Sequence, residues 1–278
     1  NVEKFSTKSK KIHVDIDPSE IGKIISVDVP IVGDVKDVLQ KLNKHVDAST
    51  HGDWLKRIEI LKEDHPSLRL PDTDKLIARQ VIRDISDVTD GDATIVTGVG
   101  QHQMWAAQHY EFKNPCSLLT SGGSGTMGYE VPAAMGAQVA KPEGTVWSIA
   151  GDGGFQMTLC ELATIVENKL PVKFAILNNG FLGMVRQWQE IFFESSYVST
   201  GYSGNPDFVK LAEAYDIKGI RVTDKTQVKT AIREAMEHDG PVLIDFIVEQ
   251  EENVYPMIPS GMTVKDMIEE PSNERVTA

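Results

Sequence analysis

The chain has 278 residues, of which 41% are hydrophobic and 25% charged, and this is the composition of a folded globular protein with one large or two unequal domains. Its formal net charge of −13 argues against binding to nucleic acids or anionic membranes, so an anionic ligand would need local help from a metal ion or from helix N-termini. The two cysteines, Cys116 and Cys160, form no C-x-x-C pair and no apolar run is long enough to cross a membrane, so we expect a cytoplasmic protein.

The first part of the chain predicts a partial α/β domain. Residues 11–16 (KIHVDI) alternate polar and apolar side chains, as a strand does. Residues 35–42 have helical spacing, with Asp34 as a candidate N-cap, and residues 51–63 predict a second amphipathic helix that is rich in charge. A strand followed by helices indicates that this segment belongs to a layered α/β structure.

A linker is predicted at residues 66–72, where two prolines interrupt a stretch without sustained periodicity. It separates a first domain at 1–65 from a second at 73–250. Residues 251–278 have a weak pattern and are interpreted as a mobile C-terminal arm. The chain begins without an initiator Met, which we interpret as a fragment or a trimmed chain.

From residue 73 onward, predicted helices and strands alternate. The helices are expected at 74–85 (capped by Asp72 or Thr73), 100–110, 131–140, 161–167 (opened by a capping box of Thr158 and Glu161), 185–193, 205–215 (capped by Asn205) and 226–238. The strands are expected at 94–97, 117–120, 145–150, 172–177, 220–222 and 242–248. Short apolar strands between amphipathic helices predict an α/β fold with a doubly wound, mostly parallel sheet that carries helices on both faces.

A glycine-rich turn, Gly151-Asp152-Gly153-Gly154, follows the predicted strand at 145–150. Ligands of doubly wound sheets bind at the carboxyl ends of strands, and glycines let the backbone approach a phosphate closely. Asp152 adds a hard oxygen that suits Mg²⁺. Taken alone, however, such a sequence is more often only a turn.

A second turn, Asn178-Asn179-Gly180, follows the predicted strand at 172–177. Asp152 and Asn179 are 27 positions apart, which fits one strand–helix–strand unit of about 30 residues. Both turns then emerge at the same edge of the sheet. A carboxylate and an amide oxygen would face one point there, as a Mg²⁺ site with a phosphate ligand requires.

Here the sequence resembles a known family. The order G-D-G at 151–153, 24 residues at 154–177 and N-N at 178–179 is similar to the signature of thiamine pyrophosphate (TPP) enzymes. Three further segments resemble acetolactate (acetohydroxyacid) synthase catalytic subunits: GVGQHQMW at 98–105, SGGSGTMGY at 121–129 and GMVRQWQ at 183–189. The resemblance extends from residue 11 to about residue 258, and it implies the end of a central domain followed by a diphosphate-binding domain.

The resemblance implies three protein ligands for Mg²⁺: Asp152, the side chain of Asn179 and the main-chain oxygen of Phe181. Gln101 and His102 would hold the diphosphate, although a lone histidine is usually a core or surface residue. The residues expected to contact TPP are Val99, Gly100, Gln101, His102, Gly125, Met127, Gly151, Asp152, Gly153, Gly154, Asn179, Phe181, Leu182, Gly183, Met184 and Val185.

Three large side chains receive roles from the same resemblance. Met127 would be an apolar wedge that bends TPP into a V shape, while the backbone of Gly125 and Met127 would bond its pyrimidine ring. Met184 and Trp188, four residues apart on one helix face, would line the substrate pocket. Without the resemblance, all three would be read as core-filling residues.

The amino-terminal part is similar to the end of the central domain, which binds FAD in acetolactate synthases. Asp15, Ile16, Gly33 and Asp34 match segments that contact FAD in that family. Acidic residues after strands are usually solvated or capping, and Asp34 fits the simpler role of an N-cap.

The function that the resemblance implies is acetolactate synthesis, in which TPP supports decarboxylation of pyruvate and condensation with a second pyruvate or 2-oxobutyrate. This reaction belongs to branched-chain amino acid synthesis. In the family, a glutamate from the pyrimidine-binding domain of a second copy of the chain activates TPP, and the resemblance implies a small regulatory subunit as a partner. No residue of this chain matches that glutamate, so we assign no catalytic residue and expect little activity from the chain alone.

Two departures from the family pattern and two alternatives stay open. Glu130 occupies a position where the family more often has a small residue, and Gly180-Phe181-Leu182 replaces commoner polar residues. Another TPP enzyme, such as a pyruvate oxidase or a 2-keto acid decarboxylase, remains an alternative. A non-catalytic module that only binds TPP and Mg²⁺ is the other.

Overall fold

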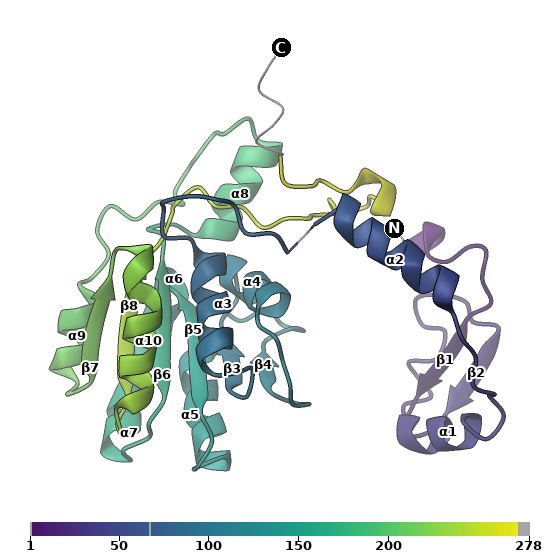
Figure 1. The fold of residues 1–278 in the computed structure, drawn as a ribbon, viewed down its shortest axis with the longest axis horizontal. Coiled ribbons are helices and arrows are strands. Elements are labelled where there is room, and N and C mark those ends of the chain that lie inside the picture. Colours follow the sequence, from purple (N-terminus) through teal and green to yellow (C-terminus); the bar gives the residue numbers. More distant parts are fainter. Residues whose placement is uncertain (1, 67, 272–278) are drawn as a thin grey trace. The chain divides into compact units, whose positions relative to one another are not determined.

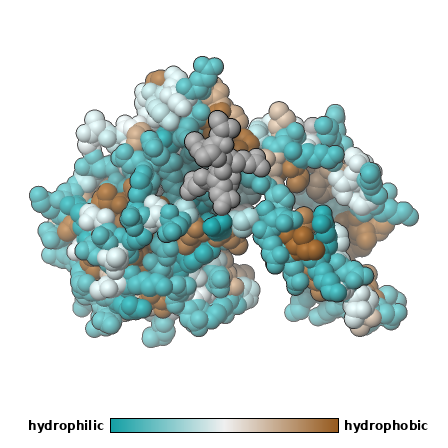
Figure 2. All heavy atoms as spheres, turned by 45° about the horizontal axis from the view of Figure 1, so that its top comes forward, coloured by the Kyte–Doolittle hydropathy of each residue, from teal (hydrophilic) through white to brown (hydrophobic). Residues whose placement is uncertain are grey.

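The computed structural model describes residues 2–66 and 68–271, which fall into two units (Figure 1). The larger unit comprises residues 68–254, and the smaller unit comprises the described parts of 1–67 and 255–278. Among the described residues, no helix has both the length and the apolar character needed to cross a membrane. Figure 2 shows mainly hydrophilic side chains on the visible face of the larger unit, with scattered hydrophobic ones.

A parallel sheet of six strands forms the centre of the larger unit, in the order β4-β3-β5-β6-β8-β7. The strands are β3 (Thr94–Thr97), β4 (Leu118–Thr120), β5 (Val146–Gly151), β6 (Lys173–Asn178), β7 (Lys218–Val222) and β8 (Val242–Ile247). The helices are α3 (Ala78–Val88), α4 (Gln101–His109), α5 (Glu130–Ala140), α6 (Asp152–Met157), α7 (Leu162–Glu167), α8 (Gly183–Phe192), α9 (Phe208–Ala214) and α10 (Val228–Glu237). All neighbouring strands pair in parallel, which confirms the predicted fold class.

The sheet is covered on both faces, and each face has its own hydrophobic core. On β5, Trp147 and Ile149 belong to the core that includes α3, α4 and α10, while Val146 and Ala150 belong to the core that includes α5, α7 and α9. This follows from the alternation of side chains along a strand. Complete burial of one large apolar side chain contributes about 1.5–3 kcal/mol, so the two cores hold the strand ends in fixed positions.

The predicted start of the first helix of this unit is wrong. Helix α3 begins at Ala78 rather than at residue 74, and neither Asp72 nor Thr73 caps it. The backbone N–H of Ala78 instead donates to the carboxylate of Glu252, 2.8 Å away and 174 residues later in the chain. A cap supplied from so far along the chain leaves no local signal in the sequence.

Two other predicted caps are also wrong. The hydroxyl of Thr158 donates to the carbonyl oxygen of Gly128 at 2.7 Å, so it forms no capping box, and a 3₁₀ turn precedes α7. Asp207, not Asn205, is the N-cap of α9, where its carboxylate accepts from Val209 N. Asn205 lies instead at the carboxyl edge of the sheet, where its side chain bonds to other side chains.

The smaller unit contains two parallel strands, β1 (Ile12–Asp15) and β2 (Val29–Val32), and the helices α1 (Val35–Leu42) and α2 (Gly52–Asp64). Asp34 is the N-cap of α1, as predicted, and its carboxylate accepts from Lys36 N at 2.9 Å. Neither helix has a buried residue. Short 3₁₀ segments lie at Val2–Lys4 and Val264–Asp266, and Met257 and Ile268 form an antiparallel bridge.

Candidate functional site

A pocket of about 540 Å³, including its open mouth, lies where the loops after β3, β5 and β6 meet at the carboxyl edge of the sheet. All the residues predicted to contact TPP line the pocket except Gly125, which is exposed in the loop between β4 and α5. Trp105, Leu177 and Val248 line it as well.

Asp152 is the acidic group of this pocket, and its side chain is buried, with 1% exposure. One carboxylate oxygen, Oδ1, accepts from Gly153 N at 3.0 Å. The other, Oδ2, accepts from Gly180 N at 2.9 Å and from Asn205 Nδ2 at 2.6 Å. Burial raises the pKa of Asp152 to about 6, although these hydrogen bonds oppose the shift. A bound cation would favour the charged form in the same place.

Asn179 and Phe181 lie in the loop after β6, next to Asp152, which follows β5. The side-chain oxygen of Asn179 accepts from Phe181 N at 3.0 Å, and its Nδ2 faces Gln101 Oε1 at 3.5 Å. Gly180, between them, has φ +71, a conformation that favours glycine. The described residues contain no cluster of three or more His, Cys, Asp or Glu side chains suited to a metal. One carboxylate with amide and carbonyl oxygens nevertheless suits Mg²⁺ that takes further oxygens from a phosphate.

The walls near Asp152 are made largely of backbone, because several residues there are glycines whose backbone lies close to neighbouring side chains. A Cβ atom on Gly100 or Gly151 would lie 3.1 Å from the imidazole ring of His102, and one on Gly183 would overlap Gln101 Oε1. His102 is buried, and its Nε2 has no hydrogen-bond partner among the described residues. Burial lowers the pKa of His102 to about 4, so the ring is neutral at pH 7. An open backbone cradle with an unpartnered ring nitrogen fits a diphosphate group.

The apolar residues predicted for the site divide between two places. Met127 and Met184 both line the pocket. Trp188 does not line it: its side chain is 53% exposed and lies in a neighbouring hollow with Val185 and Phe192.

The four residues predicted to contact FAD lie in the smaller unit, at the ends of β1 and β2. Asp15 and Gly33 are joined there by a backbone hydrogen bond of 2.9 Å, and Asp15 Oδ1 accepts from Asp17 N at 2.8 Å. Ile16 is exposed, and Asp34 caps α1.

A buried layer of amides that sequence reasoning missed lies behind the pocket. Gln101 Nε2 donates to Gln187 Oε1 at 3.0 Å and to the carbonyl oxygen of Glu252 at 2.8 Å. Gln187 and Val254 exchange two further hydrogen bonds, of 2.8 and 3.0 Å. The segment 252–254, predicted to belong to the C-terminal arm, therefore packs into the larger unit and orients Gln101 toward Asn179.

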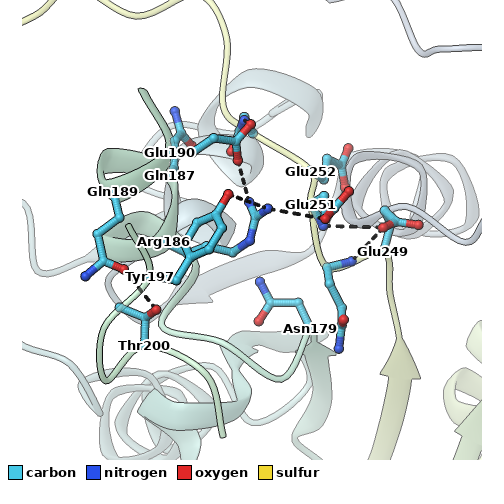
Figure 3. A network of polar contacts seen from close by, with 12 residues as sticks. Asn179, Arg186, Gln187, Gln189, Glu190, Tyr197, Thr200, Glu249, Glu251 and Glu252 are labelled. Atoms are coloured by element: carbon cyan, nitrogen blue, oxygen red, sulfur yellow. Dashed lines mark hydrogen bonds and ion pairs between the residues drawn. The ribbon is translucent and has the colours of Figure 1, made fainter. Parts of the chain in front are cut away.

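Arg186 on α8 forms a second group of contacts that sequence reasoning missed (Figure 3). The guanidinium pairs with Glu190 at 2.7 Å and bonds the hydroxyl of Tyr197 at 3.3 Å. It also lies over the rings of Phe181 and Tyr197, at 5.7 and 5.0 Å from their centroids. Arg186 thus joins α8 to the loop that carries Phe181.

Glu130, singled out as a departure from the family pattern, is a buried carboxyl behind the pocket. It begins α5, has 0% exposure and fills the space left by two glycines, Gly98 and Gly154, where a Cβ atom would overlap it. Neither of its carboxyl oxygens has a hydrogen-bond partner among the described residues. Burial raises the pKa of Glu130 to about 7, and the nearby backbone amides of Glu130 and Gly128 offset this only in part.

We therefore expect Glu130→Gln to stabilise the protein increasingly as pH rises. The folded state holds the carboxyl proton up to pH 7 or so, whereas the unfolded chain releases it near 4.5, so the parent loses stability as pH rises between these values. The gain in free energy of unfolding from the substitution, measured by urea unfolding, should be ~2 kcal/mol larger at about pH 8 than at about pH 5.5. Exposed Glu143→Gln is the matched control, and a gain independent of pH would contradict the assignment.

Comparison with known proteins adds independent information. The model of the family "Thiamine pyrophosphate enzyme, C-terminal TPP binding domain" matches residues 98–246, more than half of the chain, and the "central domain" model of the same enzymes matches residues 1–42.

Among curated proteins, the chain is 45% identical over 278 residues to the acetolactate synthase large subunit of Corynebacterium glutamicum and 44% identical over 281 residues to acetolactate synthase 1, chloroplastic, of Zea mays. Each match covers 96% of this chain and 44% of the relative. The acetolactate synthase isozyme 2 large subunit of Escherichia coli K12 is 40% identical over 265 residues, 95% of this chain and 48% of that protein. The chain thus spans somewhat less than half the length of these relatives.

Proposed function

Because the chain belongs to the thiamine pyrophosphate enzyme family and carries its C-terminal TPP-binding domain, we propose that it provides the diphosphate- and metal-binding half of an acetolactate synthase active site. The proposed reaction decarboxylates pyruvate and joins the remaining two-carbon unit to a second pyruvate or to 2-oxobutyrate. The observation that supports this best is the pocket at the carboxyl edge of the sheet, where a buried Asp152 lies among glycines.

Each proposed role rests on a contact within the pocket. Asp152, the side chain of Asn179 and the main-chain oxygen of Phe181 would hold Mg²⁺, since the three lie in adjoining loops that hydrogen bonds connect. Gln101, His102 and the glycines would hold the diphosphate, with His102 offering its unpartnered Nε2. When bound, TPP supplies an electron sink for decarboxylation.

The side of the pocket away from Asp152 is proposed to receive the rest of the cofactor and the keto acid. Met127 would support the bent cofactor, with the backbone of Gly125 and Met127 beside the pyrimidine ring. Met184 and Trp188 would lie on the substrate side, Met184 in the pocket wall and Trp188 beyond it. An apolar wall favours decarboxylation because charge is lost in that step.

Further partners are proposed with the same activity. Asp15, Ile16, Gly33 and Asp34 would contact FAD, in keeping with the central-domain match at 1–42. The activating glutamate would come from the pyrimidine-binding domain of a neighbouring whole subunit, and a small regulatory subunit would accompany a protein whose relatives are named large subunits. We propose a cytoplasmic location from the bacterial relatives, while the maize relative is named chloroplastic.

Product analysis tests the proposed reaction. The protein that carries these 278 residues is incubated in air-saturated phosphate buffer with pyruvate, TPP, FAD and Mg²⁺, and the products are identified before and after acidification. Acetolactate, detected as acetoin, is the expected product. Acetaldehyde would favour a 2-keto acid decarboxylase, acetyl phosphate with hydrogen peroxide would favour a pyruvate oxidase, and TPP binding without turnover would favour a non-catalytic module.

A further inference from the structure

We propose that Asn205 is a positioning residue for the metal site. Its amide occupies one carboxylate oxygen of Asp152 and leaves the other oxygen for the cation. The inference rests on the proposed metal-binding role of Asp152. It concerns a side chain outside the G-D-G and N-N motifs, 53 positions after Asp152 in the sequence.

The hydrogen bonds of Asp152 distinguish its two oxygens. An ionised carboxylate has about four lone-pair sites, two on each oxygen. On Oδ2 both are used, one by Asn205 Nδ2 at 2.6 Å and one by Gly180 N at 2.9 Å. On Oδ1 the structure gives one bond from another residue, that of Gly153 N at 3.0 Å. Oδ1 is therefore the oxygen with a site left for a metal ion, and coordination would be through that oxygen alone.

The amide of Asn205 is itself held in one orientation. Its Nδ2 donates to Asp152 and also to Asn178 Oδ1 at 3.0 Å, and its Oδ1 accepts from Gln156 Nε2 at 3.3 Å. Rotation of the amide by half a turn would place an oxygen against two acceptor oxygens and lose both bonds. The donor to Asp152 is thus fixed rather than adjustable.

The same chain of contacts continues across three neighbouring strands. Asn178, at the end of β6, donates to Asp245 Oδ1 on β8 at 3.0 Å, and Asp245 Oδ2 pairs with Arg221 Nε on β7 at 3.2 Å. Arg221 also bonds Asp207, the N-cap of α9. The segment 205–207 is therefore attached to the sheet at both ends.

This arrangement also separates two buried carboxylates. Asp152 and Asp245 are each 1% exposed. Asp245 has the guanidinium of Arg221 as its partner, whereas none of the ion pairs among the described residues includes Asp152. The amides of Asn178 and Asn205 lie between the two acids. Asp152 is thus left as the carboxylate whose charge a cation would neutralise.

The test measures Mg²⁺ and Ca²⁺ separately, by calorimetric titration of each cation into the chain in the presence of excess TPP, with the same titration into TPP alone subtracted. The variants are Asn205→Ala and Asn205→Leu, the second of which keeps nearly the same volume. Mg²⁺ requires near-ideal octahedral geometry, whereas Ca²⁺ accepts a carboxylate through one or both oxygens. We expect the dissociation constant for Mg²⁺ to rise about 10–100-fold, as for other residues that orient metal ligands, and that for Ca²⁺ to change about 3-fold or less.

The controls separate this inference from the proposed function. Exposed Asn168→Ala, whose side chain donates to the carbonyl oxygen of Thr164, should leave both constants unchanged. A parent chain that binds neither cation with TPP would overturn the proposed function and this inference with it. If the parent chain binds Mg²⁺ and the folded Asn205→Leu variant binds it with the same dissociation constant, this inference alone would be overturned. Equal weakening of both cations would also overturn it, because it would show a general structural role.

Discussion

Asp152→Ala is expected to lower Mg²⁺-dependent affinity for TPP at least about 100-fold, because even residues that only orient a metal ligand contribute 10–100-fold. The substitution removes the pocket's buried carboxylate, to which Gly153, Gly180 and Asn205 all donate. Asp152 is the acidic residue among those that line the pocket, and the carboxylate of nearby Asp245 is already paired with Arg221.

Calorimetric titration of TPP in the presence of Mg²⁺ measures the effect of this substitution. Asp74→Ala removes an acidic side chain that is fully exposed and serves as the matched control. Circular dichroism of each variant verifies that the fold is retained. Binding by the Ala variant that equals binding by the parent would show that Asp152 does not hold the metal ion.

Glu252→Ala is expected to lower the free energy of unfolding by about 3–5 kcal/mol, the usual cost of breaking a buried ion pair from one side. Its carboxylate accepts from Arg79 Nε at 2.5 Å and from Ala78 N at 2.8 Å, and both side chains of the pair are nearly inaccessible. The substitution thus removes the carboxylate that pairs with the buried guanidinium of Arg79. It also removes the group that accepts from the first N–H of α3. Because the carbonyl of Glu252 also orients Gln101, weaker TPP binding should accompany the lost stability.

The neighbouring residue provides a matched control for this prediction. Glu251 is 76% exposed and lies 3.7 Å from Arg186, so Glu251→Ala should change the free energy of unfolding by about 0.5 kcal/mol or less. The double variant with Arg79→Met should recover part of the loss, since the buried guanidinium that faced this carboxylate is then removed as well. Equal effects of the Glu251 and Glu252 substitutions on urea unfolding would contradict the assigned roles.

Much of the fold could be predicted because the relevant signals are local. Apolar runs such as 94–97 and 172–177 mark buried parallel strands, and the structure has strands at Thr94–Thr97 and Lys173–Asn178. Parallel strands place their carboxyl ends at one edge of a sheet, so the turns at Asp152 and Asn179 had to meet once the sheet was assigned. The pocket lies at that edge.

The remaining features depend on contacts between distant parts of the chain. Glu252 caps α3 from 174 residues away, and Asn205 bonds Asp152 instead of capping α9. Asx residues near a helix start predict a cap, and nothing in the local sequence indicates that tertiary contacts will use the side chain elsewhere. The burial of Glu130 is similar, because it depends on glycines of two other loops. The one sequence signal for Glu130 was that the family more often has a small residue at this position.

We propose that the pocket at the carboxyl edge of the sheet binds TPP through a metal ion held by Asp152. The most direct measurement is calorimetric titration of the parent chain with TPP, once with Mg²⁺ and once with a chelator in its place. We expect saturable binding of one TPP per site with Mg²⁺ and its loss in the chelator. Binding that is absent with Mg²⁺, or that persists equally in the chelator, would contradict it.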